Sequence, residues 1–169
     1  MSPTNPTKKK ARIFVPPSNL KDQLSRPGGK TRDDAVKAAI AGVEMLREKS
    51  MDAIDQAIEA VEAVAQEGMK GALTESNLKD VLRNADEIVE LAGTFRLENL
   101  DAAGRSLCDL VGLLLKVSPY PAEPIVVHAR ALRLFAPGRP SLSAAQTEVI
   151  LGELARFRAF FEARPAGTP

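Results

Sequence analysis

Four charged residues on one predicted helix have the types and spacing to bind a protein partner. They are Arg83, Asp86, Glu87 and Glu90. Arg83 lies about one helical turn before Asp86 and Glu87, and Glu90 lies about one turn after them, so a helix would carry all four on one face. Three carboxylates beside a guanidinium can form ion pairs and hydrogen bonds with a charged surface. We expect this face either to dock a partner or to be the solvated exterior of an amphipathic helix.

A second candidate site is the pair Asp52 and Gln56. The two residues are one helical turn apart and lie opposite the apolar positions Ile54 and Ile58, so both should face outward. A carboxylate and an amide would then meet the same partner. This spacing also arises by chance on many acidic helices.

Other chemistries have little support in the sequence. The chain has one cysteine, Cys108, and one histidine, His128, which excludes an intrachain disulfide and predicts neither a metal site nor a cofactor. Cys108 follows an apolar stripe and is expected to be an inert buried thiol. His128 shares the spacing of Ile125, Leu132 and Phe135, which favours a buried ring with bonded nitrogens over a reactive one.

Charge and hydropathy limit the possible partners. Lysine plus arginine total 23 against 22 for aspartate plus glutamate, so no overall field attracts nucleic acid or an anionic membrane. The longest apolar run, near residues 110–115, is far shorter than a membrane span. The basic start is followed by Pro16 and Pro17 rather than by a signal-peptide apolar region. We therefore expect a cytoplasmic protein.

The elements that would position these residues are helices. Residues 1–30 are basic and rich in proline and glycine, which predicts a flexible tail, whereas 31–165 should form a single helical bundle domain. Apolar residues at three- and four-residue steps predict five amphipathic helices, at about 31–68, 76–95, 98–117, 122–136 and 143–164. A bend is expected in the first helix at 47–50, where its stripe turns polar. The fold class predicted is an all-α antiparallel bundle.

Residues 77–116 resemble a histidine phosphotransfer (Hpt) domain. In that family a four-helix bundle carries a surface histidine that accepts a phosphoryl group and passes it to an aspartate on a receiver domain. The resemblance rests on a helix, a tight turn and a returning helix, marked by Ile88, Ala92, Gly93, Thr94, Phe95, Leu97, Leu100, Leu107 and Leu110. It implies a four-helix Hpt-like core plus an additional helix.

The chain departs from the family at the phosphoacceptor. Asp86, Val89 and Glu90 stand where Hpt domains carry the histidine, a lysine and a glycine. Phosphoryl acceptance needs an imidazole nitrogen and benefits from a nearby cation, and this stretch offers neither. The resemblance therefore implies a two-component or chemotaxis signalling protein that carries no phosphate. It would bind a response-regulator receiver or a histidine kinase through Arg83, Asp86, Glu87 and Glu90.

Two alternatives remain open. The Asp52 and Gln56 pair is similar to that of chemotaxis phosphatases of the CheZ type, in which the glutamine orients a water for attack on a receiver's aspartyl phosphate while the acid engages a receiver lysine. That resemblance implies an aspartyl-phosphate phosphatase. The other alternative is a structural helical protein that only self-associates, as a homodimer in which the long first helix pairs with its copy.

Overall fold

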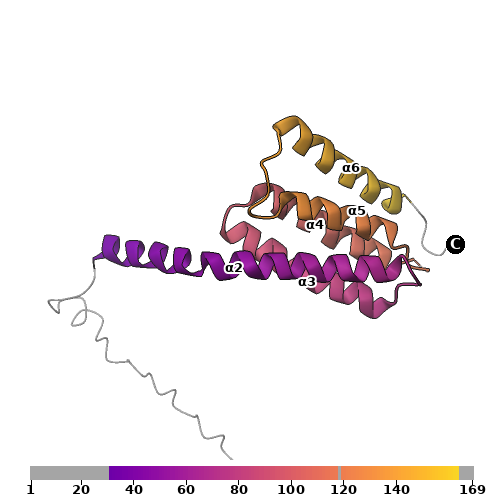
Figure 1. Ribbon diagram of the computed structural model, residues 1–169, viewed down its shortest axis with the longest axis horizontal. Coiled ribbons are helices and arrows are strands. Elements are labelled where there is room, and N and C mark those ends of the chain that lie inside the picture. The colour runs from indigo at the N-terminus through magenta and orange to yellow at the C-terminus, as the bar shows by residue number, and fades with distance from the viewer. Residues whose placement is uncertain (1–30, 118, 164–169) are drawn as a thin grey trace, which may run out of the picture. The chain divides into compact units, whose positions relative to one another are not determined.

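The computed structural model describes residues 31–117 and 119–163, and these residues are all-α. They form five helices, with no named strand among them: α2 (Arg32–Gly68), α3 (Glu75–Thr94), α4 (Glu98–Leu114), α5 (Glu123–Phe135) and α6 (Ala144–Glu162). An isolated antiparallel bridge joins Leu73 to Tyr120. The predicted helical bundle is confirmed (Figure 1). The tail predicted for residues 1–30 lies outside the described residues.

Side-chain caps fix where three of the helices begin. The hydroxyl of Thr31 accepts the backbone N–H of Asp34 (3.1 Å), and that of Ser143 accepts the N–H of Gln146 (3.2 Å), as their spacing predicts. A capping box at Thr74, with Asn77 as its partner, starts α3 slightly before the predicted residue. Each cap satisfies backbone donors that the first helical turn leaves unpaired.

Helix α2 runs through residues 47–50 without a break, and the bend expected there stays a prediction. The polar stretch makes contacts of its own. The Arg47 guanidinium lies 5.2 Å from the centre of the Phe95 ring, and its Nε donates to Glu44 (2.8 Å). A cation over an aromatic face is attracted by the ring, so the polar stretch is consistent with a continuous helix.

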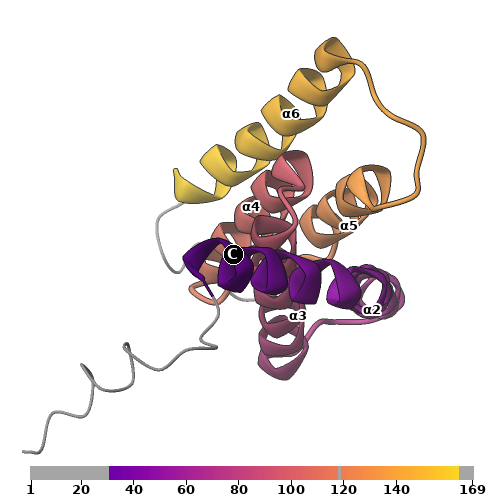
Figure 2. The same cartoon turned by 90° about the vertical axis from the view of Figure 1, so that its left-hand side faces the viewer.

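The core belongs to the second of two units into which the chain divides, residues 1–41 and 42–169. All five helices contribute side chains that are almost completely buried, among them Ile58, Ile88, Leu107, Leu132 and Leu154. Helix α4 packs against α3, α5 and α6. Helix α6 lies beyond α4 and α5, on the side away from α3 (Figures 1 and 2). Helix α4 thus has α3 as one neighbour and α5 and α6 as the others.

Helices α3 and α4 approach each other closely at Gly104. A Cβ atom placed on Gly104 would lie 2.8 Å from Cγ2 of Val89 and 3.6 Å from Cγ2 of Ile88. Only glycine leaves room for the two helices at this separation.

The turn between α3 and α4 contains a strained residue. The N–H of Leu97 donates to the carbonyl of Ala92 (2.9 Å) and that of Arg96 to the carbonyl of Gly93 (3.4 Å), the hydrogen-bond pattern of a Schellman cap. Arg96 adopts a φ of 56° there, the left-handed conformation that glycine usually supplies. The turn reverses the chain within three residues and makes α3 and α4 antiparallel.

Candidate functional site

Helix α3 exposes one charged face, which we call the α3 face: Arg83, Asp86, Glu87 and Glu90. The opposite side of the helix is buried through Leu78, Val81, Ala85, Ile88 and Ala92. Nη2 of Arg83 lies 2.9 Å from a carboxylate oxygen of Asp80, an exposed pair one turn apart. The α3 face therefore projects from a helix that is fixed by its own core contacts.

Asp86 lies at the seam between α3 and α4. The thiol of Cys108 on α4 donates to its Oδ1 at 3.3 Å. Burial, and then the hydrogen bond and negative charge of Asp86, raise the pKa of Cys108 from 9.0 to about 12. The thiol consequently stays protonated at neutral pH, which fits the predicted inert cysteine, although it is only half-buried.

The two other positions of the phosphoacceptor pattern differ in exposure. Val89, in place of the lysine, is partly buried and packs toward Gly104 of α4. Glu90, in place of the glycine, is exposed and adds a negative charge beside Asp86. Neither position supplies a cation or the close access that a transferring phosphoryl group would use.

His128 is buried inside the bundle, as predicted, with both ring nitrogens bonded. Its Nδ1 lies 2.8 Å from the carbonyl oxygen of Pro124, which can only accept, so Nδ1 carries the proton. Nε2 therefore accepts from the Ser106 hydroxyl at 3.1 Å. Burial lowers the pKa of His128 and keeps the ring neutral. The chain's one imidazole is thus enclosed and cannot meet a receiver's aspartate in this conformation.

Asp52 and Gln56 are both exposed on α2, one turn apart, as their spacing predicts. Among the described residues, no hydrogen bond or ion pair joins this pair to the α3 face. The structure therefore leaves two separate candidate sites on two helices.

Sequence reasoning missed the ion pairs that fasten α2 to α5. Nε of Arg133 donates to Oε1 of Glu62 (3.0 Å), and its Nη1 donates to Oδ1 of Asp55 (3.4 Å). Asp55 is the residue next to Gln56 in the chain. The hydrogen bond to Glu62 raises the pKa of Arg133. No local spacing rule links positions that are 71 residues apart, so the sequence offered no signal for this contact.

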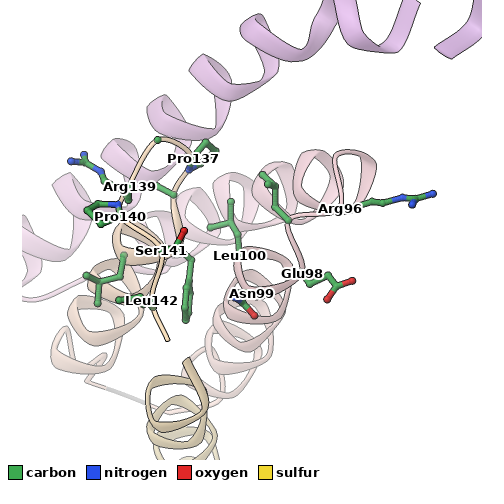
Figure 3. A pocket seen from close by; sticks show the side chains of 14 residues that line it. Arg96, Glu98, Asn99, Leu100, Pro137, Arg139, Pro140, Ser141 and Leu142 are labelled. Atoms are coloured by element: carbon green, nitrogen blue, oxygen red, sulfur yellow. The ribbon is translucent and has the colours of Figure 1, made fainter. Parts of the chain in front are cut away.

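A cavity of about 410 Å³ lies between the α3–α4 turn and the connection from α5 to α6 (Figure 3). Its polar lining includes Arg96, Glu98, Asn99, Arg139 and Ser141. The side chains of Arg96 and Arg139 extend in opposite directions rather than toward a common point (Figure 3). Convergent polar groups are what fix a ligand's orientation, and these two guanidinium groups do not converge.

The described residues contain no cluster of three or more histidine, cysteine, aspartate or glutamate side chains that could hold a metal ion. Within the same part of the chain, no helix combines the length and apolar character needed to cross a bilayer. No protein-family model, curated protein or solved structure matches this chain.

Proposed function

We propose that this protein is a non-catalytic docking protein of two-component signalling, which holds a response-regulator receiver domain on the α3 face. The observation that carries the proposal is the exposure of Arg83, Asp86, Glu87 and Glu90 on a helix fixed by core contacts. The position that Hpt domains use for phosphate transfer holds Asp86, which is bonded to Cys108. The proposal rests on the resemblance of this hairpin to Hpt domains together with that exposed surface.

The mechanism is occupancy of the receiver. A receiver held on the α3 face would be withheld from a true phosphotransfer protein. If the α3 face prefers one of the receiver's two conformations, binding would also shift the receiver's equilibrium by that difference in affinity. Neither effect needs a phosphoryl group on this chain.

The test is a binding titration of purified receivers from the same cell, unphosphorylated and phosphorylated, against the full chain. Asp86→Arg is expected to weaken binding by about tenfold or more, because it reverses a charge at the centre of the α3 face. Glu148→Arg is the matched control, since it reverses the charge of an exposed carboxylate on α6, which carries neither candidate site. If no receiver binds, or if both variants weaken binding equally, the proposal is wrong. Binding of a histidine kinase instead would reassign the partner.

A second candidate function is dephosphorylation of the receiver's aspartyl phosphate. The observation in its favour is that Asp52 and Gln56 are exposed one turn apart on a well-formed helix. An amide can place a water in line with the phosphorus while the receiver supplies its own metal and phosphate.

The lifetime of the phosphorylated receiver separates the two functions. A lifetime that this protein shortens, and that Gln56→Ala restores without loss of binding, would establish the phosphatase. Binding with an unchanged lifetime would support the docking protein.

A further inference from the structure

The first half of α2 exposes apolar side chains at regular helical spacing. Val36, Ile40, Val43 and Leu46 are 50%, 60%, 42% and 57% exposed. Single exposed apolar residues are common on protein surfaces, but a row of them on one helix is a feature of interfaces. Helical segments gain most of their stability in water from packing an apolar face. The exposed apolar row on α2 therefore indicates a surface that binds a partner.

Three residues of the row, Val36, Ile40 and Val43, have the spacing of a coiled-coil seam, and Leu46 lies beside it. Val36, Ile40, Val43 and Arg47 are separated by steps of four, three and four residues, which alternate between the d and a positions of a heptad. The same rhythm continues along α2 into Ile54, which is buried in the core. Met45, which is 82% exposed, falls at the f position on the opposite side of the helix.

The two flanks of this seam differ in character. One flank, at the e positions, carries Lys37 and Glu44, which have opposite charges. The other flank, at the g positions, carries Arg32, Ala39 and Leu46. This asymmetry decides how a second copy can pair, because flanking positions meet differently in parallel and antiparallel coiled coils.

In an antiparallel pair each flank meets the same flank of the other copy. Lys37 then faces Glu44 of the second copy, and by symmetry this ion pair occurs twice. The apolar flanks, with Ala39 and Leu46, also meet each other. In a parallel pair the unlike flanks meet, which sets Arg32 against the like charge of Lys37 of the second copy and leaves Glu44 with only Arg47 of its own chain as a partner. Charge complementarity therefore favours the antiparallel arrangement.

We propose that two copies of this chain pair antiparallel through residues 32–47 of α2. In this register Ile40 of each copy packs on Val43 of the other, and the symmetry axis passes between Ala41 and Gly42. Arg47 caps the seam beside Val36 of the second copy, keeping its own contacts with Glu44 and Phe95. The pairing is independent of receiver binding.

Sedimentation equilibrium of the full chain tests the pairing. The wild-type chain is expected to be a dimer at about 100 μM, and Ile40→Glu to raise the dimer dissociation constant by about tenfold or more. Met45→Glu makes a similar change on the opposite face and should leave the dimer intact. Circular dichroism of each variant checks that the helices remain. A wild-type chain that stays monomeric at this concentration, or equal effects of Ile40→Glu and Met45→Glu, would overturn the proposal.

A charge swap tests the direction of pairing. Lys37→Glu and Glu44→Lys should each weaken the dimer, because each sets like charges opposite one another at two symmetric places. The double variant Lys37→Glu/Glu44→Lys restores opposite charges and should recover most of the affinity. Failure of the double variant to recover would overturn the antiparallel register. Neither experiment includes a receiver, so its failure is distinguishable from failure of the docking function.

Discussion

The Ser106 hydroxyl on α4 donates to Nε2 of His128 on α5, across 3.1 Å in the interior of the bundle. The ring's other nitrogen donates to the Pro124 carbonyl at 2.8 Å. In the neutral ring the Pro124 carbonyl holds the proton on Nδ1, which leaves Nε2 to accept from Ser106. A second proton on Nε2 would make the Ser106 hydroxyl change from donor to acceptor and would place a charge in a desolvated site. The histidine is therefore a fixed part of the core rather than a titrating surface group.

The stability of the fold should depend on pH through His128. Burial lowers its pKa in the folded state below the ordinary 6.5, so on acidification the unfolded chain binds a proton first. The contribution of His128 is thus fully present above pH 6.5 and is lost as the pH falls through the lowered pKa. In this window the slope approaches about 1.4 kcal/mol per pH unit.

Urea unfolding between pH 5 and 8 measures this effect, with His128→Gln as the control. Carboxylates titrate in both proteins, so the difference between the two pH profiles isolates the histidine. Parallel profiles for the two proteins would contradict the prediction.

Gly104→Ala should destabilise the bundle by about 1–3 kcal/mol, since the added methyl group would meet Val89 at 2.8 Å and force α3 and α4 apart. Gly112→Ala is the matched control on the same helix, because a Cβ there has no neighbour within 4 Å. That control should stabilise the protein by about 0.5–1 kcal/mol through helix propensity. Thermal unfolding of both variants measures the two changes in stability. Changes of the same sign would refute the close approach at Gly104.

Arg96→Gly should stabilise the protein by about 0.5–1 kcal/mol, because glycine adopts a φ of 56° without the steric cost that a side chain carries. Arg96→Val should destabilise it, since a β-branched residue is least compatible with this conformation. Denaturant midpoints of the two variants give the test. A fall in stability for both would mean that the Arg96 side chain contributes more than its backbone strain costs.

Arg133→Met should lower stability by about 1–2 kcal/mol, because it keeps the aliphatic stem but leaves Glu62 and Asp55 facing each other without their cation. Arg105→Met removes an exposed pair with Asp101 on a single helix and should have a much smaller effect. Unfolding in low and high salt distinguishes the two, since the pairs of Arg133 are less accessible to screening ions. Equal losses would remove the case for Arg133 as a link between α2 and α5.

Cys108 should react slowly with a disulfide reagent at pH 8, at least about a hundredfold slower than an unhindered thiol, because a pKa of about 12 leaves little thiolate. Asp86→Asn removes the negative charge beside the thiol, which lowers its pKa and speeds the reaction. The rate is measured from the absorbance of the thiolate that the disulfide reagent releases. A rate unchanged by Asp86→Asn would show that the Cys108–Asp86 contact does not control the thiol.

The sequence predicted the helices well because apolar periodicity and capping spacing are local properties. Thr31 with Asp34, and Ser143 with Gln146, form the predicted caps. The exposure of Asp52, Gln56 and the α3 face followed from the same periodicity. Their roles in binding or catalysis stay predictions, because exposure alone does not choose between a solvated surface and an interface.

What the sequence could not predict depends on contacts between distant residues. The thiol of Cys108 meets Asp86 only because α4 returns along α3, and Arg133 reaches Glu62 only because α5 lies beside α2. The contact made by the polar stretch at 47–50 was missed for the same reason. A polar interruption of the stripe indicated a weak point, whereas Phe95, from the end of α3, lies under Arg47.

The ion pairs of Arg133 also bear on the order in which the fold assembles. The α3–α4 hairpin closes over a short loop, so its contacts cost little chain entropy, whereas Arg133 and Glu62 must close a loop of 71 residues. We therefore expect the hairpin to form early and α2 to dock on α5 late in folding. We expect the first half of α2, which has no buried residue before Ile54, to open most easily. Its amide protons should exchange with solvent deuterium before those of α3 and α4.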